Sequence, residues 1–161
     1  MKTLTNQLLS DLNTSYWEFL HQESFDKAFV KLQEKVAQNT VYGTFKETNE
    51  VPAFHEREIP ISHITHLITN IRIVDNKIIG DISFLKDEHF IKAKKLAYLP
   101  VIRAFGGFKE YADISRAVEG YYDGQRLYID EFCSWDYVKS DQHPYRTVNE
   151  MNDFKSFFQI D

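Results

Sequence analysis

The sequence contains few of the residues that cross-link or interrupt a chain. Cys133 is its one cysteine, which excludes an intramolecular disulfide and argues against a zinc site built from cysteines. The 161 residues include only 4 prolines and 6 glycines, so the composition is neither collagen-like nor that of a low-complexity chain. A chain of this length is expected to form one folded domain of ordinary size.

Long apolar runs and an excess of positive charge are also missing. No run approaches the ~18 apolar residues that a membrane-spanning helix needs, and residues 1–10 lack the basic head and apolar stretch of a signal peptide. The formal net charge of −5 argues against a general polyanion binder. We therefore expect a protein inside the cell that binds neither membranes nor nucleic acids. Aromatic residues are plentiful, with 13 Phe, 9 Tyr and 2 Trp for a sizeable core.

The first 38 residues show helical spacing and contain neither glycine nor proline. Leu4, Leu8 and Leu12 recur at i+4, and Ser24 is a suitable N-cap for a second helix. One stripe of that second helix is formed by Phe25, Ala28, Phe29, Leu32 and Val36. Such a stripe usually packs on a core, and docking onto a partner is the alternative. We predict a helical N-terminal arm over residues 1–38.

Residues 39–140 favour strands with one helix among them. Alternation of apolar and polar residues indicates a short strand over 41–46. Asp87 can cap a helix over 88–98, which Pro100 would end. A strand over 101–108 is predicted to follow.

Two β-hairpins are predicted. The clearest alternation runs over 67–85 and is interrupted by Asp75-Asn76-Lys77, a sequence that tolerates the left-handed conformations of a tight turn. The second hairpin would pair residues 116–122 with 126–132 around Asp123-Gly124.

Hairpins in place of β-α-β crossovers favour an antiparallel or mixed sheet. We therefore predict an α+β fold, a small antiparallel or mixed β-barrel with flanking helices. The predicted organisation is a helical N-terminal arm over 1–38, a β-rich domain over 39–140 and a C-terminal tail over 141–161. The tail is expected to hold a short amphipathic helix over 148–158.

Single residues indicate little chemistry. His63 and His66 lie three apart with His55 upstream, but residues three apart in a strand point to opposite faces, and the HExxH spacing of zinc proteases is missing. We expect no metal site and no cofactor. Cys133 is expected to be a small buried hydrophobe rather than a reactive thiol. Ser115 lies in no GxSxG motif.

The stretch from His66 onward resembles a known family. His66-Leu67-Ile68-Thr69 precedes an extended apolar run, the turn Asp75-Asn76-Lys77 and a strand with Gly80-Asp81-Ile82. This order resembles the prohead, or capsid maturation, proteases of tailed bacteriophages, serine enzymes related in fold to herpesvirus assemblin. In a competing register His63 is the family histidine, and Gly80 then fits less well. The resemblance covers about residues 58–140 and implies a protein of the host cytoplasm or the virion.

The family pattern continues from Pro100 to Gly106, where Arg103 and Gly106 match the family's arginine and glycine and are carried over as binding residues. The two positions at which the nucleophilic serine is expected hold Val101 and Ile102, whose side chains have no oxygen for acyl transfer. The resemblance therefore implies a degenerate, protease-like chain.

Three functions stay open. The first is a catalytically inactive phage head-assembly or virion structural protein that binds capsid, scaffold or portal proteins and forms a homo-oligomer. The second is an active serine endopeptidase that processes capsid and scaffold proteins, with His66 as base and Ser115 as nucleophile. The third is a cytoplasmic β-barrel module that binds a peptide or a small acid, with the guanidinium of Arg103 as its anion contact.

Overall fold

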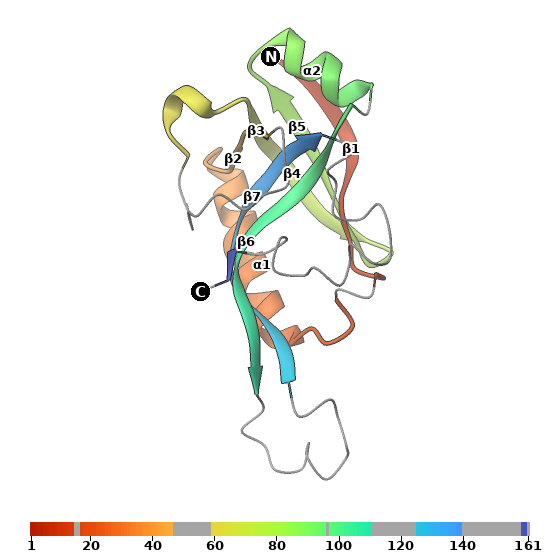
Figure 1. Cartoon of the computed structure of the whole chain (residues 1–161), viewed down its shortest axis with the longest axis vertical. Helices are drawn as coiled ribbons and strands as arrows, with labels where there is room; N and C mark the ends of the chain where they lie inside the picture. The colour runs from red at the N-terminus through yellow and green to blue at the C-terminus, as the bar shows by residue number, and fades with distance from the viewer. Residues whose placement is uncertain (15–16, 47–58, 96, 111–124, 140–158, 161) are drawn as a thin grey trace.

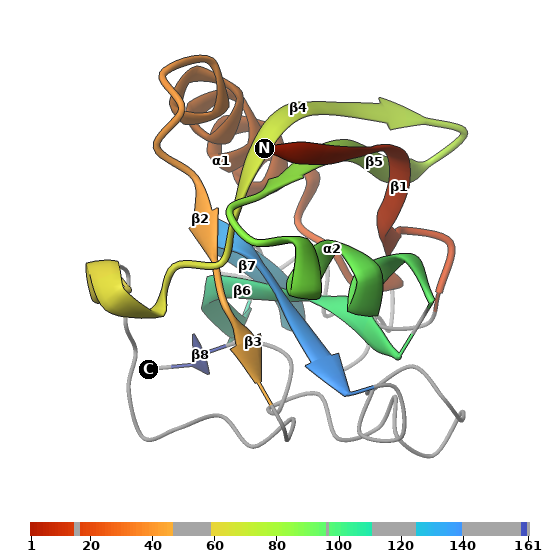
Figure 2. The same ribbon diagram turned by 90° about the horizontal axis from the view of Figure 1, so that it is seen from above.

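The computed structural model describes residues 1–14, 17–46, 59–95, 97–110, 125–139 and 159–160. The strands of these ranges form two four-stranded sheets (Figures 1 and 2). The first sheet has the order β1-β5-β4-β2, with bounds Lys2–Asp11, Lys77–Phe84, His66–Val74 and Tyr42–Gly43. The second has the order β3-β7-β6-β8, with bounds Phe45–Lys46, Gln125–Lys139, Tyr98–Glu110 and Gln159–Ile160.

The prediction of an α+β fold with mixed strands is confirmed, whereas the closed barrel is not. All strand pairs of the first sheet are antiparallel, and β3–β7 and β6–β8 in the second are parallel. The chain leaves the first sheet after β2 and enters the second at β3, with only Thr44 between them. The described strands form two separate sheets that share no strand pair, so no continuous hydrogen-bond ladder closes them into a barrel.

Strand β1 corrects the prediction of a helix around residues 4–12. It runs antiparallel to β5, and two register shifts together with a φ of 55° at Asn6 break its alternation. Leu9 is buried, whereas Leu8 of the predicted helical stripe is 49% exposed. Pairing with β5 satisfies the backbone and outweighs the local helical preference. Whether residues 39–140 form a separate domain stays a prediction.

Helix α1, Gln22–Ala37, confirms the predicted apolar stripe and corrects its cap. All five stripe residues are buried, and the rings of Phe25 and Phe29 meet Phe132 of β7 edge to face. The N-cap is His21, whose Nδ1 accepts the backbone N–H of Ser24 at 3.1 Å. The Ser24 hydroxyl instead accepts the backbone N–H of Ile129 in β7, which ties the helix to the sheet.

The hairpin predicted over 67–85 is confirmed as β4 and β5. Asp75 and Asn76 have φ angles of 50° and 60°, as the tight turn between these strands requires. The register sets His66, the first residue of β4, opposite Phe84, the last residue of β5. His66 is therefore placed at the end of the sheet from which the chain continues toward α2.

Helix α2 is shorter than predicted. It spans Asp87–Lys94, with Lys86 rather than Asp87 as its N-cap. β6 already begins at Tyr98, because Pro100 holds the residue before it in extended backbone and the strand pairs with β7.

The strand predicted over 126–132 is confirmed as part of β7. β7 pairs with β6 along its whole length, from Gln125 opposite Glu110 to Lys139 opposite Tyr98. The segment 116–122 itself and the predicted tail helix lie outside the described residues.

The expected aromatic core is present between the two sheets and under α1. Its largest fully buried side chains include Trp135, Tyr137, Phe84, Phe105 and Phe132. The indole Nε1–H of Trp135 donates to the hydroxyl of Ser10 at 2.9 Å, which joins β7 to β1 inside this core.

Candidate functional site

The site begins at His66, which is fully buried where β2, β4 and β7 meet. Its ring is enclosed by three aromatic side chains. The centroid distances are 5.1 Å to Tyr137, 5.7 Å to Phe84 and 6.0 Å to Phe45. A ring in this position lies behind an apolar wall rather than in a cleft.

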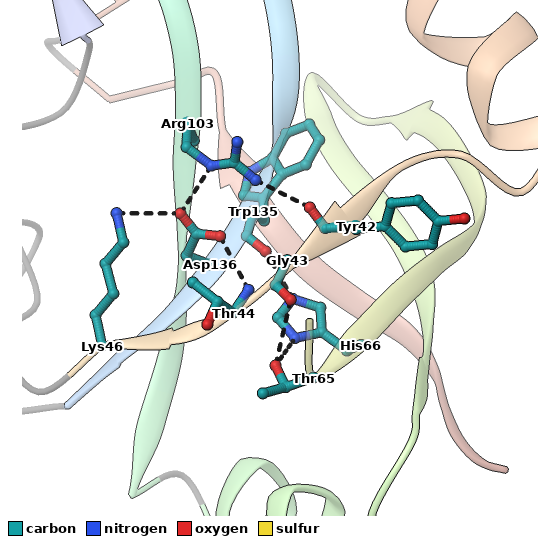
Figure 3. Close-up of polar contacts among 9 residues, drawn as sticks. All are labelled: Tyr42, Gly43, Thr44, Lys46, Thr65, His66, Arg103, Trp135 and Asp136. Atoms are coloured by element: carbon teal, nitrogen blue, oxygen red, sulfur yellow. Dashed lines mark hydrogen bonds and ion pairs between the residues drawn. The ribbon is translucent and has the colours of Figure 1, made fainter. Parts of the chain in front are cut away.

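Both ring nitrogens of His66 have hydrogen-bond partners (Figure 3). Nε2 lies 2.8 Å from the backbone carbonyl oxygen of Trp135, and Nδ1 lies 2.8 Å from the hydroxyl oxygen of Thr65. A carbonyl oxygen only accepts, so Nε2 carries the proton and donates it to Trp135. Nδ1 is then an acceptor, and the Thr65 hydroxyl donates its one proton to it at 2.8 Å in preference to the Gly43 carbonyl oxygen, which lies 3.3 Å away.

The electrostatics of His66 favour the neutral imidazole. Burial lowers its pKa to about 4, against the opposing effects of the Trp135 carbonyl and the Asp136 carboxylate. A proton taken up at Nδ1 would place a cation among aromatic rings. His66 is therefore a weak base at neutral pH.

Gly43 in β2 is required by the packing around His66. A Cβ at this position would lie 2.0 Å from His66 Nε2 and 2.4 Å from the Trp135 carbonyl oxygen. Only a glycine lets β2 cross the hydrogen bond between these residues.

Beside His66, a buried carboxylate is held by two cations. Asp136 Oδ2 lies 3.0 Å from Arg103 Nε and 3.2 Å from Lys46 Nζ, and Oδ1 accepts the backbone N–H of Thr44 at 3.1 Å (Figure 3). Burial alone would raise the pKa of Asp136, but Arg103 and Lys46 outweigh it and the pKa is lowered. The Arg103 Nη2 donates to the carbonyl of Tyr42 at 2.9 Å. These contacts tie β2 and β3 to β6 and β7.

The predicted site residues are thus only partly brought together. Arg103 is 3% exposed and bound to Asp136 and Tyr42, and a role in ligand binding stays a prediction. A Cβ on Gly106 would lie 2.2 Å from the Tyr128 carbonyl oxygen beside a register shift, so close strand contact already requires a glycine there. Ser115 lies outside the described residues.

The apolar positions in place of the serine lie next to the His66 contact. Val101 and Ile102 are both buried in β6, and the register sets Ile102 opposite Trp135, whose carbonyl accepts the His66 proton. The competing histidine, His63, is exposed in a short 3₁₀ helix, Ile61–His63. Of the two registers, the one with His66 therefore places the histidine near the positions expected for the nucleophile.

A pocket of about 600 Å³ lies beside Asp136, Arg103 and Lys46, which contribute to its lining. Its walls come from β3, the 3₁₀ helix, the start of α2 and β7, and they include Phe45, Lys46, His63, Thr65, Lys86 and His89. In Figure 2, β3 lies between the 3₁₀ helix and α2. The volume is that of a small-ligand or peptide side-chain site.

Comparisons with known proteins give a structural likeness and no match in sequence. No protein-family model matches the sequence, and no curated protein matches it. The structure is similar to that of the capsid assembly protease of bacteriophage T4, with a TM-score of 0.46 and 12% sequence identity, over 86% of this chain and 91% of that chain. A likeness of this extent does not by itself establish a common fold or a function.

The described residues hold no group of three His, Cys, Asp or Glu side chains that could ligate a metal, and His55 lies outside them. In the same ranges, neither helix has the length and apolar character needed to cross a membrane.

Sequence reasoning missed Thr65, Asp136 and Lys46. A signal for Asp136 was present, since it lies inside the aromatic run Trp135 to Tyr137 and a carboxylate buried there needs cationic partners. No local pattern identifies Lys46 or Arg103 as those partners, because they come from strands far apart in the sequence.

Proposed function

We propose that this chain is a phage head-assembly or virion structural protein on a prohead-protease-like fold, and that it acts by binding rather than by hydrolysis. The observation that carries the proposal is the closed environment of His66. Acyl transfer needs a nucleophilic oxygen within reach of an accessible base. Here the base is enclosed by aromatic rings, and both of its nitrogens are engaged.

The missing nucleophile supports the same conclusion. Val101 and Ile102 are buried and apolar at the positions expected for the serine. Loss of the nucleophile costs a serine protease on the order of 10⁶ in turnover. A chain that lacks the nucleophile can still bind partners through its surface, but it cannot hydrolyse peptides efficiently.

The phage role is proposed from the sequence. The order from His66 to Gly80, followed by Arg103 and Gly106, resembles the prohead proteases. Capsid, scaffold or portal proteins are the proposed partners, with a homo-oligomer as the assembled form. Host cytoplasm and virion are the proposed locations.

A second candidate function rests on one contact. The Thr65 hydroxyl donates to His66 Nδ1, and the Trp135 carbonyl orients the ring, so the three groups have the order of nucleophile, base and orienting acceptor. In such a reaction Thr65 Oγ1 would attack a peptide carbonyl carbon while its proton passes to Nδ1. The imidazolium would return that proton to the leaving amine as the C–N bond breaks, and water would then hydrolyse the acyl-threonine ester. Against it stands the buried imidazolium that the attack creates, so we place hydrolysis second.

A fluorophosphonate probe tests inactivity and separates the alternatives. The folded full chain is treated with the probe, and the labelled residue is located by peptide mass spectrometry, with an active serine hydrolase in the same tube as a control. We expect no label on this chain. Labelling at Ser115 would establish the serine endopeptidase, and labelling at Thr65 would establish the threonine hydroxyl as nucleophile.

Head association needs its own measurement. Procapsids and mature heads of the phage that encodes the chain are purified and their proteins quantified by mass spectrometry. We expect the chain in stoichiometric amounts in one of these particles. Its absence from both, together with normal head assembly when its gene is removed, would contradict the proposed role.

A further inference from the structure

The pocket beside Asp136, Arg103 and Lys46 lies along the outer edge of β3. Among the described strands, β3 is the terminal strand of its sheet, and β7 is its partner on one side. Phe45 and Lys46 are consecutive in β3, so their side chains point to opposite faces. Both line the pocket, which therefore passes around the outer edge of β3 instead of covering one face.

The backbone at this edge is suited to pair with a further strand. The Tyr137 N–H donates to the Thr44 carbonyl at 2.9 Å, on the side of β3 that faces β7. Because backbone groups alternate in direction along a strand, the N–H and C=O of Phe45 point away from β7. An extended peptide can add to such an edge by main-chain hydrogen bonds and place alternate side chains in pockets.

The charges at the mouth of the pocket favour an anionic side chain. Lys86 and His63 are exposed there, from α2's N-cap and the 3₁₀ helix. The buried Asp136 at the inner end is held by Arg103 and Lys46, so its repulsion of an incoming carboxylate is offset. The remaining acid of the described lining, Glu88, is 62% exposed and screened by water.

His89 adds a polar group at the aromatic wall of the pocket. Its ring stacks on Phe45 with centroids 4.7 Å apart, and its Nδ1 is buried with no hydrogen-bond partner in the described residues. Burial lowers its pKa, so the ring is neutral and able to gain a proton when a negative charge approaches.

We propose that this pocket binds an acidic side chain of an extended peptide that pairs with the outer edge of β3. The inference rests on the proposed function in one respect, since it locates the contact by which the chain would act. A carboxylate fits better than a doubly charged phosphate, because Glu88 and Asp136 both face the pocket. The volume of about 600 Å³ also exceeds what a free small acid fills.

The test is an NMR titration of the full chain with a capped peptide of alternating alanine and glutamate. We expect saturable shifts at the Phe45 amide and at the imidazoles of His63 and His89, with the pKa of the His89 ring raised in the complex. Three other ligands serve as arms: the same peptide with glutamine in place of glutamate, a version N-methylated at alternate backbone nitrogens, and free glutarate. Each is expected to bind more weakly than the glutamate peptide.

Variants on one helix supply the matched control. Lys86→Gln removes a charge at the pocket, and we expect it to weaken binding roughly three- to fivefold, the effect of a partly exposed ion pair. Lys94→Gln removes the same charge from the exposed end of α2, away from the pocket lining, and is expected to leave binding unchanged.

Several results would overturn the proposal. These are equal binding of the glutamate and glutamine peptides, equal binding of glutarate, unimpaired binding of the N-methylated peptide, or equal losses in the two lysine variants. Absence of any shift at millimolar peptide would do so as well. A positive probe-labelling result would contradict the inactive function without affecting this site, so the two failures are distinguishable.

Discussion

His66 in β4 donates its Nε2 proton to the carbonyl of Trp135 in β7, and this 2.8 Å bond joins the two sheets inside the core. The same ring accepts the Thr65 hydroxyl on its other nitrogen. A histidine that occupies a catalytic position in the resemblance therefore has a structural role in this chain.

Removal of the His66 ring should destabilise the fold strongly. His66→Ala leaves a cavity and an unpaired carbonyl at Trp135, and we expect a loss of about 3 kcal/mol in the free energy of unfolding, measured with urea. His63→Ala, three residues away and exposed, should change it by less than about 0.5 kcal/mol. Similar losses in the two variants would contradict the structural role.

Stability should decline in mild acid because of His66. Its pKa is lowered to about 4 from an ordinary 6.5, so between these values the unfolded chain binds a proton that the native chain does not. The free energy of unfolding that the neutral His66 contributes is fully present above pH 6.5. It is lost as the pH drops toward 4, by on the order of 3 kcal/mol.

The comparison with His66→Gln isolates this effect. His89 also has a pKa lowered by burial and adds a decline of the same sign, whereas the lowered pKa of Asp136 acts below its ordinary 3.8. Urea unfolding is measured across the range for both proteins. Parallel pH profiles would show that His66 does not carry the decline.

The Asp136 carboxylate should be essential to the fold. Asp136→Asn removes the buried anion beside Arg103 and Lys46, and we expect a loss of about 3–5 kcal/mol, as for other broken buried pairs. Glu131→Gln in the same strand breaks the partly exposed pair with Lys35 and should cost less than about 1 kcal/mol. Thermal unfolding of the two variants measures the difference, and equal Tm shifts would refute the argument.

A serine introduced where the resemblance predicts the nucleophile should not produce hydrolysis. In Ile102→Ser the hydroxyl would enter an apolar core opposite Trp135, and His66, which donates to the Trp135 carbonyl, has both nitrogens engaged. We expect no fluorophosphonate label at position 102 and a stability loss of about 3 kcal/mol. Ile73→Ser, at a position that is 42% exposed, controls for the substitution itself and should cost much less. A label at position 102 would show that the site is only one residue from activity.

Local sequence patterns predicted the helix and strands whose local conformational preference agrees with the contacts that they make in the fold. The alternation over 67–85 and the turn residues Asp75 and Asn76 specify the β4–β5 hairpin without help from the rest of the chain. The stripe of α1 likewise predicts the face that packs on β7. The leucines near the N-terminus have helical spacing, but this segment pairs with the edge of β5 and forms strand β1 instead.

The candidate site could be predicted only in part. His66 was identified through its spacing to Gly80, whereas its burial and its bond to Trp135 depend on a residue from the other sheet. Arg103 was predicted to be a binding residue, and no local pattern indicated that it is a buried partner of Asp136. Such contacts depend on pairing between strands that are far apart in the sequence. A local pattern of residues does not indicate which distant strands will pair.

The sequence by itself determined the absence of disulfides, the aromatic supply of the core, the α1 stripe, the β4–β5 hairpin and the apolar residues at the family's serine position. These are properties of composition and of short-range periodicity. Only the tertiary structure decided that β1 is a strand, that His66 is enclosed and neutral, and that Arg103, Lys46 and Asp136 form one buried cluster. Each of these depends on burial and on distant partners, which exist only once the two sheets have come together.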